Sequence, residues 1–360
     1  MLGVEPAFWR DRRVLITGHT GFKGSWLTLW LRSLGAQVAG YALEPPTEPS
    51  LFELADLSSC CSHHIGDVRD CDSVLEVFSA EKPEIVFHLA AQPLVRESYR
   101  SPLATMATNV MGTANVLEAA RSTTGVRALV VVTTDKCYSN RESLWPYSED
   151  DALGGHDPYS ASKACAELVT AAWRASFPRE DLAIASARAG NVIGGGDWAA
   201  DRLVPDALRC WARRQCLEVR NPHAIRPWQH VLDPLHGYLL LAQQLIREQG
   251  AEAWNFGPNE DDMIPVDKLL NLLARSWGPG AHWQAGRNDH PHEASLLRLD
   301  STKARMRLGW RPVWALDTAI AQTVRWHRAH SDGADMRSLS LADIASFQDA
   351  AAHARGALRA

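Results

Sequence analysis

Two short stretches of the sequence carry side chains that suit proton transfer: Thr134, Asp135 and Lys136 in TTDK, and Tyr159 and Lys163 in YSASK. The first three directly follow a run of apolar β-formers. A charged pair at the end of a buried strand costs free energy unless another group uses it. We therefore interpret Asp135 and Lys136 as functional residues, with a structural ion pair at the strand end as the alternative.

Tyr159 and Lys163 are four residues apart, which places them on one face of a helix. A phenol with a pKa of about 10 is a poor base at neutral pH. A neighbouring ammonium, together with the positive charge of a nicotinamide, is expected to lower that pKa. Tyr159 can then take a proton from a sugar hydroxyl while the same carbon gives a hydride to the nicotinamide. Thr134 is expected to bind the substrate oxygen and complete a catalytic triad.

The loop TGHTGFKG places Gly18, Gly21 and Gly24 between a predicted strand and a predicted amphipathic helix. Glycines at these points allow a tight turn and let the backbone approach a pyrophosphate at the helix N-terminus. The loop, with Thr20 and Phe22, therefore predicts a dinucleotide site. Its GxxGxxG spacing is similar to that of the short-chain dehydrogenases/reductases.

The choice between NAD and NADP depends on the end of the second strand, where an acid would read the ribose 2′-hydroxyl. Glu44 is the first acid there and comes late, so NAD is favoured and NADP stays open. Asp67, beside Val68 at the end of the third strand, is expected to contact adenine. A loop-capping aspartate is the alternative.

Asp135 and Lys136 are surplus for a simple reductase or epimerase, which needs only Thr134, Tyr159 and Lys163. An elimination does need them, because a ketone at carbon 4 of a hexose makes the proton on carbon 5 acidic. We assign Asp135 as the general acid that protonates the departing hydroxyl of carbon 6, and Lys136 as the base. The neighbouring carboxylate favours charged lysine, so shared or reversed roles stay open.

These residues lie in a first half that alternates short apolar runs with helical patterns, as expected for a parallel sheet covered on both faces. The predicted strands span 13–18, 36–43, 85–91, 127–134 and 182–189. The predicted helices span 25–35, 70–81, 104–121 and 158–176. The fold class is therefore α/β, a Rossmann-type doubly wound parallel sheet with a smaller C-terminal substrate-binding lobe.

The rhythm changes after about residue 190, where glycine, tryptophan and proline crowd the chain. We assign residues 1–190 to the NAD-binding domain, which the chain re-enters near 230–257, and residues 191–229 and 258–345 to the smaller lobe. Further helices are predicted at 203–215, 233–248 and 266–277, and a late strand at 253–257. The stretch SDGADMRSLSLADIASFQ reads as a peripheral helix.

The composition fits an ordinary globular protein, with 360 residues, 46% hydrophobic and 22% charged. A formal net charge of -5 argues against nucleic acid as a partner. No apolar run reaches the roughly 18 residues of a membrane span, so no membrane partner is expected. Seven scattered cysteines without a CxxC pair predict reduced thiols and a cytoplasmic protein.

Five motifs together resemble the CDP-glucose 4,6-dehydratases, a branch of the extended short-chain dehydrogenase/reductase superfamily. They are GHTGFKGSWL, TTDKCYSN, LGGHDPYSASKACAE, RAGNVIGGGDWAADRLVPD and RPWQHVLDPLHGYLLLA, and the likeness runs from about residue 10 to 310. The Asp135–Lys136 pair marks the branch, since dTDP-glucose dehydratases carry Asp-Glu there.

The resemblance implies CDP-glucose as substrate, tightly held NAD, and a homodimer or homotetramer assembled through the helices near 104–121 and 158–176. It assigns five residues to the substrate: Asn191, Arg202, Arg226, His292 and Glu293. It also places Ala90, Gln92 and Asn109 at the cofactor. No metal site is expected, because no further ligand pattern accompanies His290 and His292.

Two alternatives remain at this stage. One is another nucleotide-sugar 4,6-dehydratase, acting on a GDP- or dTDP-hexose. The other is a non-catalytic dinucleotide sensor; such proteins lose the Tyr/Lys pair, which is intact here.

Overall fold

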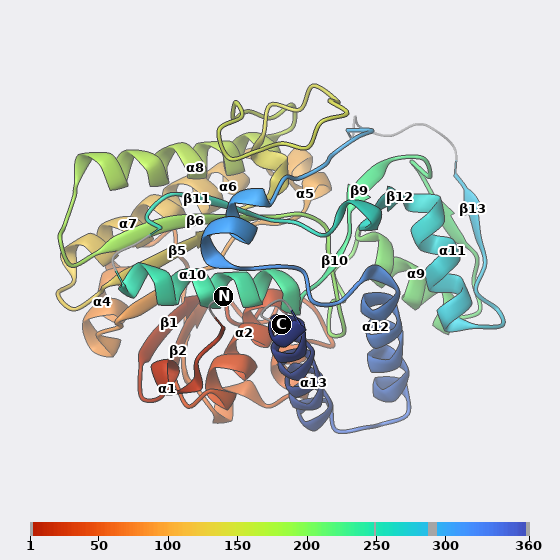
Figure 1. Ribbon diagram of the computed structural model, residues 1–360, viewed down its shortest axis with the longest axis horizontal. Helices are drawn as coiled ribbons and strands as arrows, with labels where there is room; N and C mark the ends of the chain where they lie inside the picture. The colour runs from red at the N-terminus through yellow and green to blue at the C-terminus, as the bar shows by residue number, and fades with distance from the viewer. Residues whose placement is uncertain (1–2, 248–249, 287–293, 358–360) are drawn as a thin grey trace.

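A seven-stranded parallel sheet forms the centre of the protein in a computed structural model that describes residues 3–247, 250–286 and 294–357 (Figure 1). The strands run in the order β11-β6-β5-β4-β1-β2-β3. Their bounds are β1 (Arg13–Thr17), β2 (Gln37–Ala42), β3 (Ser62–Ile65), β4 (Ile85–His88), β5 (Ala128–Val132), β6 (Ala183–Ala189) and β11 (Ala253–Phe256). The order reverses between β1 and β4, which is where a doubly wound sheet opens a crevice for a ligand. The predicted fold class is confirmed.

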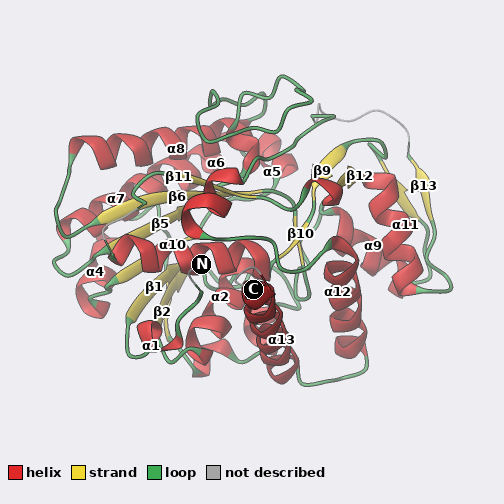
Figure 2. Cartoon of the chain, in the orientation of Figure 1, coloured by secondary structure: helices red, strands yellow, loops and turns green. Residues whose placement is uncertain are grey.

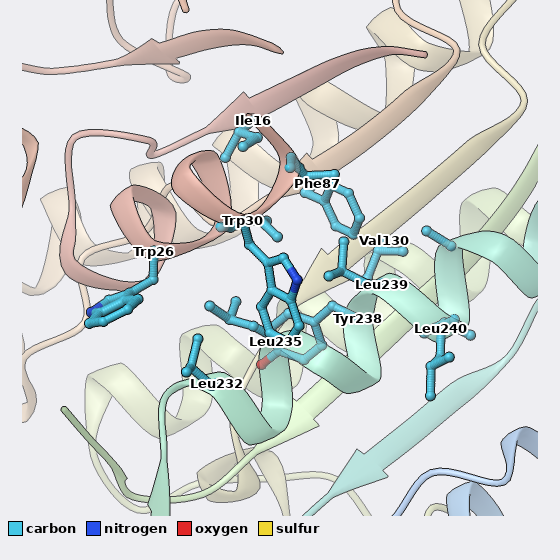
Figure 3. Packing of buried hydrophobic residues seen from close by; sticks show 14 of the residues in the cluster. Ile16, Trp26, Trp30, Phe87, Val130, Leu232, Leu235, Tyr238, Leu239 and Leu240 are labelled. Atoms are coloured by element: carbon cyan, nitrogen blue, oxygen red, sulfur yellow. The ribbon is translucent and has the colours of Figure 1, made fainter. Parts of the chain in front are cut away.

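Helices cover both faces of this sheet because successive side chains of a buried strand point to opposite faces. On one face lie α2 (Phe22–Ser33), α10 (Leu232–Ile246) and α13 (Met336–Ala357), and on the other α4 (Cys71–Glu81), α7 (Gly112–Ser122) and α8 (Pro158–Ser176). Along β5, Val130 packs into the first core and Leu129 and Val131 into the second. Figure 3 shows Trp30 of α2 and Tyr238 of α10 meeting Val130 and Phe87 in the first core.

A smaller lobe lies beside the carboxyl ends of the strands, at the right of Figure 1. It contains α9 (Leu203–Ala212), α11 (Val266–Trp277), α12 (Leu316–Ser331) and the strand pairs β8 (Leu217–Val219) with β13 (Trp283–Ala285) and β9 (Ile225–Pro227) with β12 (Met263–Pro265). A core of its own includes Trp211, Leu269 and Ile320. The pair β7 (Val192–Ile193) and β10 (Gln229–His230) runs between this lobe and the sheet. The residue limits of the two predicted domains stay predictions.

Short elements complete the described chain. They are α1 (Pro6–Trp9), α3 (Leu51–Leu54), α5 (Val95–Arg100), α6 (Pro102–Met106), a π-helical turn (Ala107–Met111), a second one near the C-terminus (Ala304–Leu308), two short 3₁₀ turns (Leu57–Ser59 and Glu260–Asp262) and, after β5, a 3₁₀ turn (Asp135–Cys137). Figure 2 shows the long loop that joins this 3₁₀ turn to α8 at the top of the molecule. No helix of the described chain is both long and apolar enough to cross a bilayer. All seven cysteines are free thiols, and the cytoplasmic location stays a prediction.

The prediction of a peripheral C-terminal helix is wrong for one face of α13. Ile344 and Phe347 are buried in the main core. The Phe347 ring meets Trp30 of α2 at 5.6 Å and Trp314 at 5.2 Å between ring centroids. The helix therefore belongs to the layer that supports the nucleotide-binding half of the sheet.

Candidate active site

The carboxyl end of β5 carries the predicted acid and base on a tight turn. Thr134 caps the 3₁₀ turn, because its hydroxyl accepts a hydrogen bond from the Lys136 backbone N–H at 3.3 Å. The same hydroxyl lies 3.0 Å from Oδ1 of Asp135, to which it donates. β5 therefore ends just before this turn, and the charged pair lies at the carboxyl ends of the parallel strands.

Asp135 is buried with only half of its carboxyl group satisfied. Its side chain is 1% exposed, and Oδ2 has no hydrogen-bond partner within the described ranges. A Cβ on Gly190 would stand 2.9 Å from this oxygen, so the glycine leaves the space beside it free. Burial raises the pKa of Asp135, against the lowering effect of the Lys136 charge. A carboxyl group that holds its proton more firmly than usual suits the predicted role of general acid.

Lys136 faces a pocket on the substrate side of the sheet. The pocket is lined by residues from five parts of the chain, including Tyr138, Asn140, His156, Asp157, Arg226 and Leu297. Arg226 also donates to the carbonyl of Ile225 at 2.8 Å and to that of Ala294, which fixes its guanidinium at the rim. Lys136 and Arg226, two of the predicted site residues, therefore line the same pocket.

Tyr159 lies in the first turn of α8, whose N-cap Asp157 accepts from the Ser160 N–H at 2.9 Å. Burial raises the pKa of Tyr159 to about 12, and a hydrogen bond with Thr134 opposes this rise. The structure thus brings Thr134 and Tyr159 together as predicted. Burial outweighs the charges around Tyr159 in the protein alone, and the fall in its pKa, which was predicted with a nicotinamide bound, stays a prediction.

Lys163 lies one turn further along α8 and is also buried. Its Nζ donates to the carbonyl of Val132 at 3.3 Å, the last residue of β5. Burial lowers the pKa of Lys163 to about 8, and the nearby Glu167 carboxylate opposes that fall. The ammonium thus stands under the strand end that carries Thr134.

Lys23 is a site residue that sequence reasoning missed. It lies in the first turn of α2, and burial with the charges of Arg202 and Lys163 lowers its pKa to about 7. Asp135 and Asp197 act on it in the opposite sense. The available signal was a lysine in a loop of otherwise small or apolar residues, TGHTGFKG.

The glycine loop forms a cradle that suits a diphosphate. Gly18 has φ +80, and a Cβ there would lie 2.7 Å from the backbone nitrogen of Ala90. A Cβ on Gly24 would lie 2.1 Å from the Gly18 carbonyl oxygen. Gly21 is the N-cap of α2, and no side chain of the described chain caps this helix. Thr20 donates to the carbonyl of Leu43 at 2.9 Å. Helix amides that no side chain caps, at the switch point of the sheet, fit the pyrophosphate of a dinucleotide.

The remaining predicted cofactor residues lie on α2 and on the segments that follow β4. Asn109, in the π-helical turn, accepts from the Gln92 N–H at 2.8 Å and donates to Ser162 Oγ at 2.8 Å. It thereby ties the segment after β4 to α8. Phe22 begins α2 beside the loop. Their contacts with a dinucleotide stay predictions.

Asp67 behaves as a loop cap in the protein itself. Its carboxylate accepts from the Arg69 backbone N–H at 2.9 Å and from Arg69 Nε at 2.8 Å, and these bonds lower its pKa. Val68 is buried, and a Cβ on Gly112 of α7 would lie 2.7 Å from it. The alternative of a capping aspartate therefore has direct support, and the adenine contact stays a prediction.

Some of the predicted substrate residues lie in the described part of the chain and others do not. Arg202 pairs with the buried carboxylate of Asp197 at 2.9 Å, and its charge acts on Tyr159. Asn191 contributes its backbone carbonyl to Gln229 N–H at 3.0 Å. His292 and Glu293, like His290, lie outside the described residues. Within residues 3–247, 250–286 and 294–357, no group of three or more His, Cys, Asp or Glu side chains is placed to hold a metal ion.

Fold and site together define a Rossmann-type protein of the short-chain dehydrogenase/reductase class. The sheet opens at a glycine loop, and Thr134, Tyr159 and Lys163 meet at the carboxyl end of β5. The family model described as GDP-mannose 4,6 dehydratase matches residues 15–323, and the chain belongs to this dehydratase family.

Individual relatives agree with this assignment. The chain is 49% identical over 355 residues to a CDP-glucose 4,6-dehydratase of Salmonella typhimurium strain LT2, covering 96% of this chain and 99% of that protein. It is 28% identical to a dTDP-glucose 4,6-dehydratase of Streptomyces niveus, covering 88% of this chain and 93% of that protein. A solved dTDP-glucose 4,6-dehydratase of Streptomyces venezuelae with bound NAD shares the fold, with a TM-score of 0.78 at 24% identity over 89% of this chain and 98% of that one.

Proposed function

We propose that the protein is an NAD-dependent hydro-lyase that converts CDP-glucose into CDP-4-keto-6-deoxyglucose and water. The observation that carries this proposal is the half-satisfied carboxyl group of Asp135, buried between the hydrogen-bonded pair Thr134–Tyr159 and the pocket of Lys136. An epimerase has no use for that acid and base, whereas an elimination needs both.

In the first stage Tyr159 removes the proton of the hydroxyl at carbon 4, with Thr134 bound to the same oxygen. The glycine loop would hold NAD, which would supply a hydride acceptor for carbon 4 and, later, a hydride donor for carbon 6. The charge of Arg202 favours the ionised form of the phenol, and Lys163 lies one helical turn further along α8. Burial keeps the phenol protonated in the protein alone.

In the second stage Lys136 removes the proton on carbon 5 while Asp135 gives its proton to the hydroxyl of carbon 6. Water leaves, and a carbon–carbon double bond forms between carbons 5 and 6. Return of the proton to carbon 5 and of the hydride to carbon 6 completes the product. Every electron pair taken in the first stage is returned, so no net oxidation occurs.

Two arginines support the binding of a diphosphate, and the relatives support the choice of base and cofactor. Arg226 lies at the rim of the Lys136 pocket and Arg202 on the Tyr159 side, so a diphosphate between them would meet cationic groups suited to it. The cytidine base is proposed from the 49% identical relative, whose printed activity is on CDP-glucose. NAD rather than NADP is proposed from the NAD-bound structure of the same fold.

A homodimer or homotetramer is proposed from the surface of the helices near 104–121 and 158–176. Leu103 is 84% exposed, Met111 58% and Leu168 57%. Apolar side chains gathered on neighbouring helices favour burial against a second copy.

The test is turnover of three substrates, CDP-glucose, dTDP-glucose and GDP-mannose, followed by NMR of the products. We expect a 4-keto-6-deoxy sugar from CDP-glucose at a kcat/KM at least about 100-fold above the other two. Equal or faster turnover of GDP-mannose would move the proposal to another nucleotide. Firm NAD binding with no product from any of the three would favour the sensor alternative.

A further inference from the structure

A buried ion pair lies directly beneath the catalytic residues, between Glu167 of α8 and Arg188 of β6. The two charged groups are 2.8 Å apart, and the side chains are 2% and 4% exposed. Glu167 also accepts hydrogen bonds from the Thr133 hydroxyl and, at 2.6 Å, from the Ser186 hydroxyl. A carboxylate withdrawn from water is tolerable only with such partners.

This pair holds both ends of the strand-end segment (residues 133–138), which carries Thr134, Asp135 and Lys136. At the start of the segment, Thr133 donates to Glu167. At its end, the Tyr138 hydroxyl accepts from Arg188 at 2.8 Å, and the guanidinium lies 5.0 Å from the centre of the Tyr138 ring. The Tyr138 hydroxyl in turn donates to Asn255 of β11 at 2.7 Å.

The same carboxylate belongs to the helix that carries Tyr159 and Lys163. Glu167 comes one turn after Lys163 on α8, so a single side chain links that helix to the strand-end segment. The charged or titratable groups near Lys163 come from four elements: Glu167 of α8, Cys137 of the 3₁₀ turn, His88 of β4 and Lys23 of α2. His88 is kept neutral by burial, which lowers its pKa to about 3, and Lys23 adds a like charge. Glu167 is thus the carboxylate that offsets the desolvation of the Lys163 ammonium.

We propose that Glu167 is a positioning residue for the proposed dehydration, which holds the strand-end segment against α8 and places its carboxylate one helical turn from Lys163. The inference rests on the proposed function for its kinetic readout. The titration readout is independent of the proposed function, because the charge state of Lys163 can be measured without substrate.

The experiment compares Glu167→Gln with the wild-type protein. The alkaline limb of the kcat profile should follow Lys163, whose pKa is about 8, since activity is lost as the ammonium deprotonates. Without the carboxylate this midpoint should move toward acid by about one pH unit or more. The maximal kcat should fall by about 100-fold, because the side chains of the strand-end segment and of α8 are no longer held in the correct relative positions.

A second measurement uses protein labelled with 15N-lysine, in which the Lys163 Nζ signal is assigned by its loss in Lys163→Met. We expect the Lys163 titration to shift to lower pH in Glu167→Gln, while the Lys23 signal keeps its own, lower midpoint. If wild-type protein dehydrates no nucleotide sugar, the proposed function fails and this titration still decides the inference.

Two further variants separate positioning from stability. Asp343→Asn breaks an ion pair between the buried Asp343 carboxylate of α13, across the sheet from α8, and the half-exposed Arg325. It should leave the alkaline limb and the Lys163 titration unchanged, because it lies across the sheet from Lys163. Should Glu167→Gln fail to fold, Glu167→Gln with Arg188→Met removes both charges and keeps the interior neutral. An unshifted Lys163 titration and alkaline limb, in either Glu167 variant, would overturn the proposal.

Discussion

Asp135 and Glu167 are both nearly inaccessible carboxylic acids at the same end of the sheet, yet their surroundings differ. Glu167 is bonded by two hydroxyls and paired with Arg188. Asp135 receives one hydroxyl, and its Oδ2 has no partner within the described chain. A satisfied buried carboxylate holds structure, whereas one left half-satisfied at a pocket costs stability and is available for chemistry.

The largest effect is expected for Asp135→Asn. Turnover of CDP-glucose should fall by about 10²–10⁴-fold, because an amide is far too weak an acid to protonate the departing hydroxyl. Thermal stability should hold or rise, since the variant removes a buried ionisable group. Kinetics with differential scanning calorimetry checks both; a loss of stability like that of Glu167→Gln would erase the contrast between the two acids.

Lys136→Met tests the proposed base, the partner of Asp135 in the elimination. Turnover should fall by about 100-fold through the elimination step, while the first oxidation stays fast. In a single turnover, the absorbance of reduced nicotinamide should therefore build up and persist. Lys303→Met is the control, because Lys303 pairs with Glu252 at the outer strand and has no role in the site. Dehydration at the wild-type rate would show that Lys136 is not the base.

Asp233 is a third buried carboxyl group, in the first turn of α10 and away from the proposed chemistry. Like Asp135, it has one oxygen, Oδ2, without a hydrogen-bond partner in the described chain. Its Oδ1 accepts from the Val313 N–H at 2.6 Å, and burial raises its pKa to about 8. A carboxyl group with a raised folded pKa stabilises the protein at low pH, and this contribution is lost as the pH rises toward 8.

Asp233→Asn should therefore remove a few kcal/mol of pH dependence from the unfolding free energy between about pH 4 and 8. Activity at neutral pH should stay within about twofold of wild type. Chemical denaturation at a series of pH values measures this, and parallel curves for the two proteins would contradict it.

The smallest effect is expected for Asp67, a half-exposed carboxylate that Arg69 already occupies. Such a pair contributes no more than about 1 kcal/mol. Asp67→Ala should weaken NAD binding by at most about fivefold, as measured by calorimetric titration. A loss of 100-fold would make Asp67 a true adenine ligand and not a loop cap.

The sequence supported the elements and residues whose signals are local. The glycine loop, the Tyr159–Lys163 spacing and the helices at 158–176 and 266–277 all follow from neighbours within a few residues, and the structure places these helices at the predicted bounds. The pairing of Thr134, at the end of β5, with Tyr159, in the first turn of α8, was also expected from the chain order of the two motifs.

The remaining features depend on contacts between distant parts of the chain. Glu167 meets Arg188 across 21 positions and Thr133 across 34, so its type alone carried no signal. The buried face of α13 depends on Trp30, more than three hundred positions away. The pKa of Tyr159 required the full extent of burial, which exceeds the effect of any single charge in the protein.

Turnover of CDP-glucose in deuterated water tests the elimination by Asp135 and Lys136 most directly. Removal and return of a proton at carbon 5 predicts one deuterium at that carbon in a 4-keto-6-deoxy product, detected by NMR. A product that keeps its original hydrogen at carbon 5, or that retains the hydroxyl of carbon 6, would contradict the account and indicate a plain oxidoreductase or epimerase.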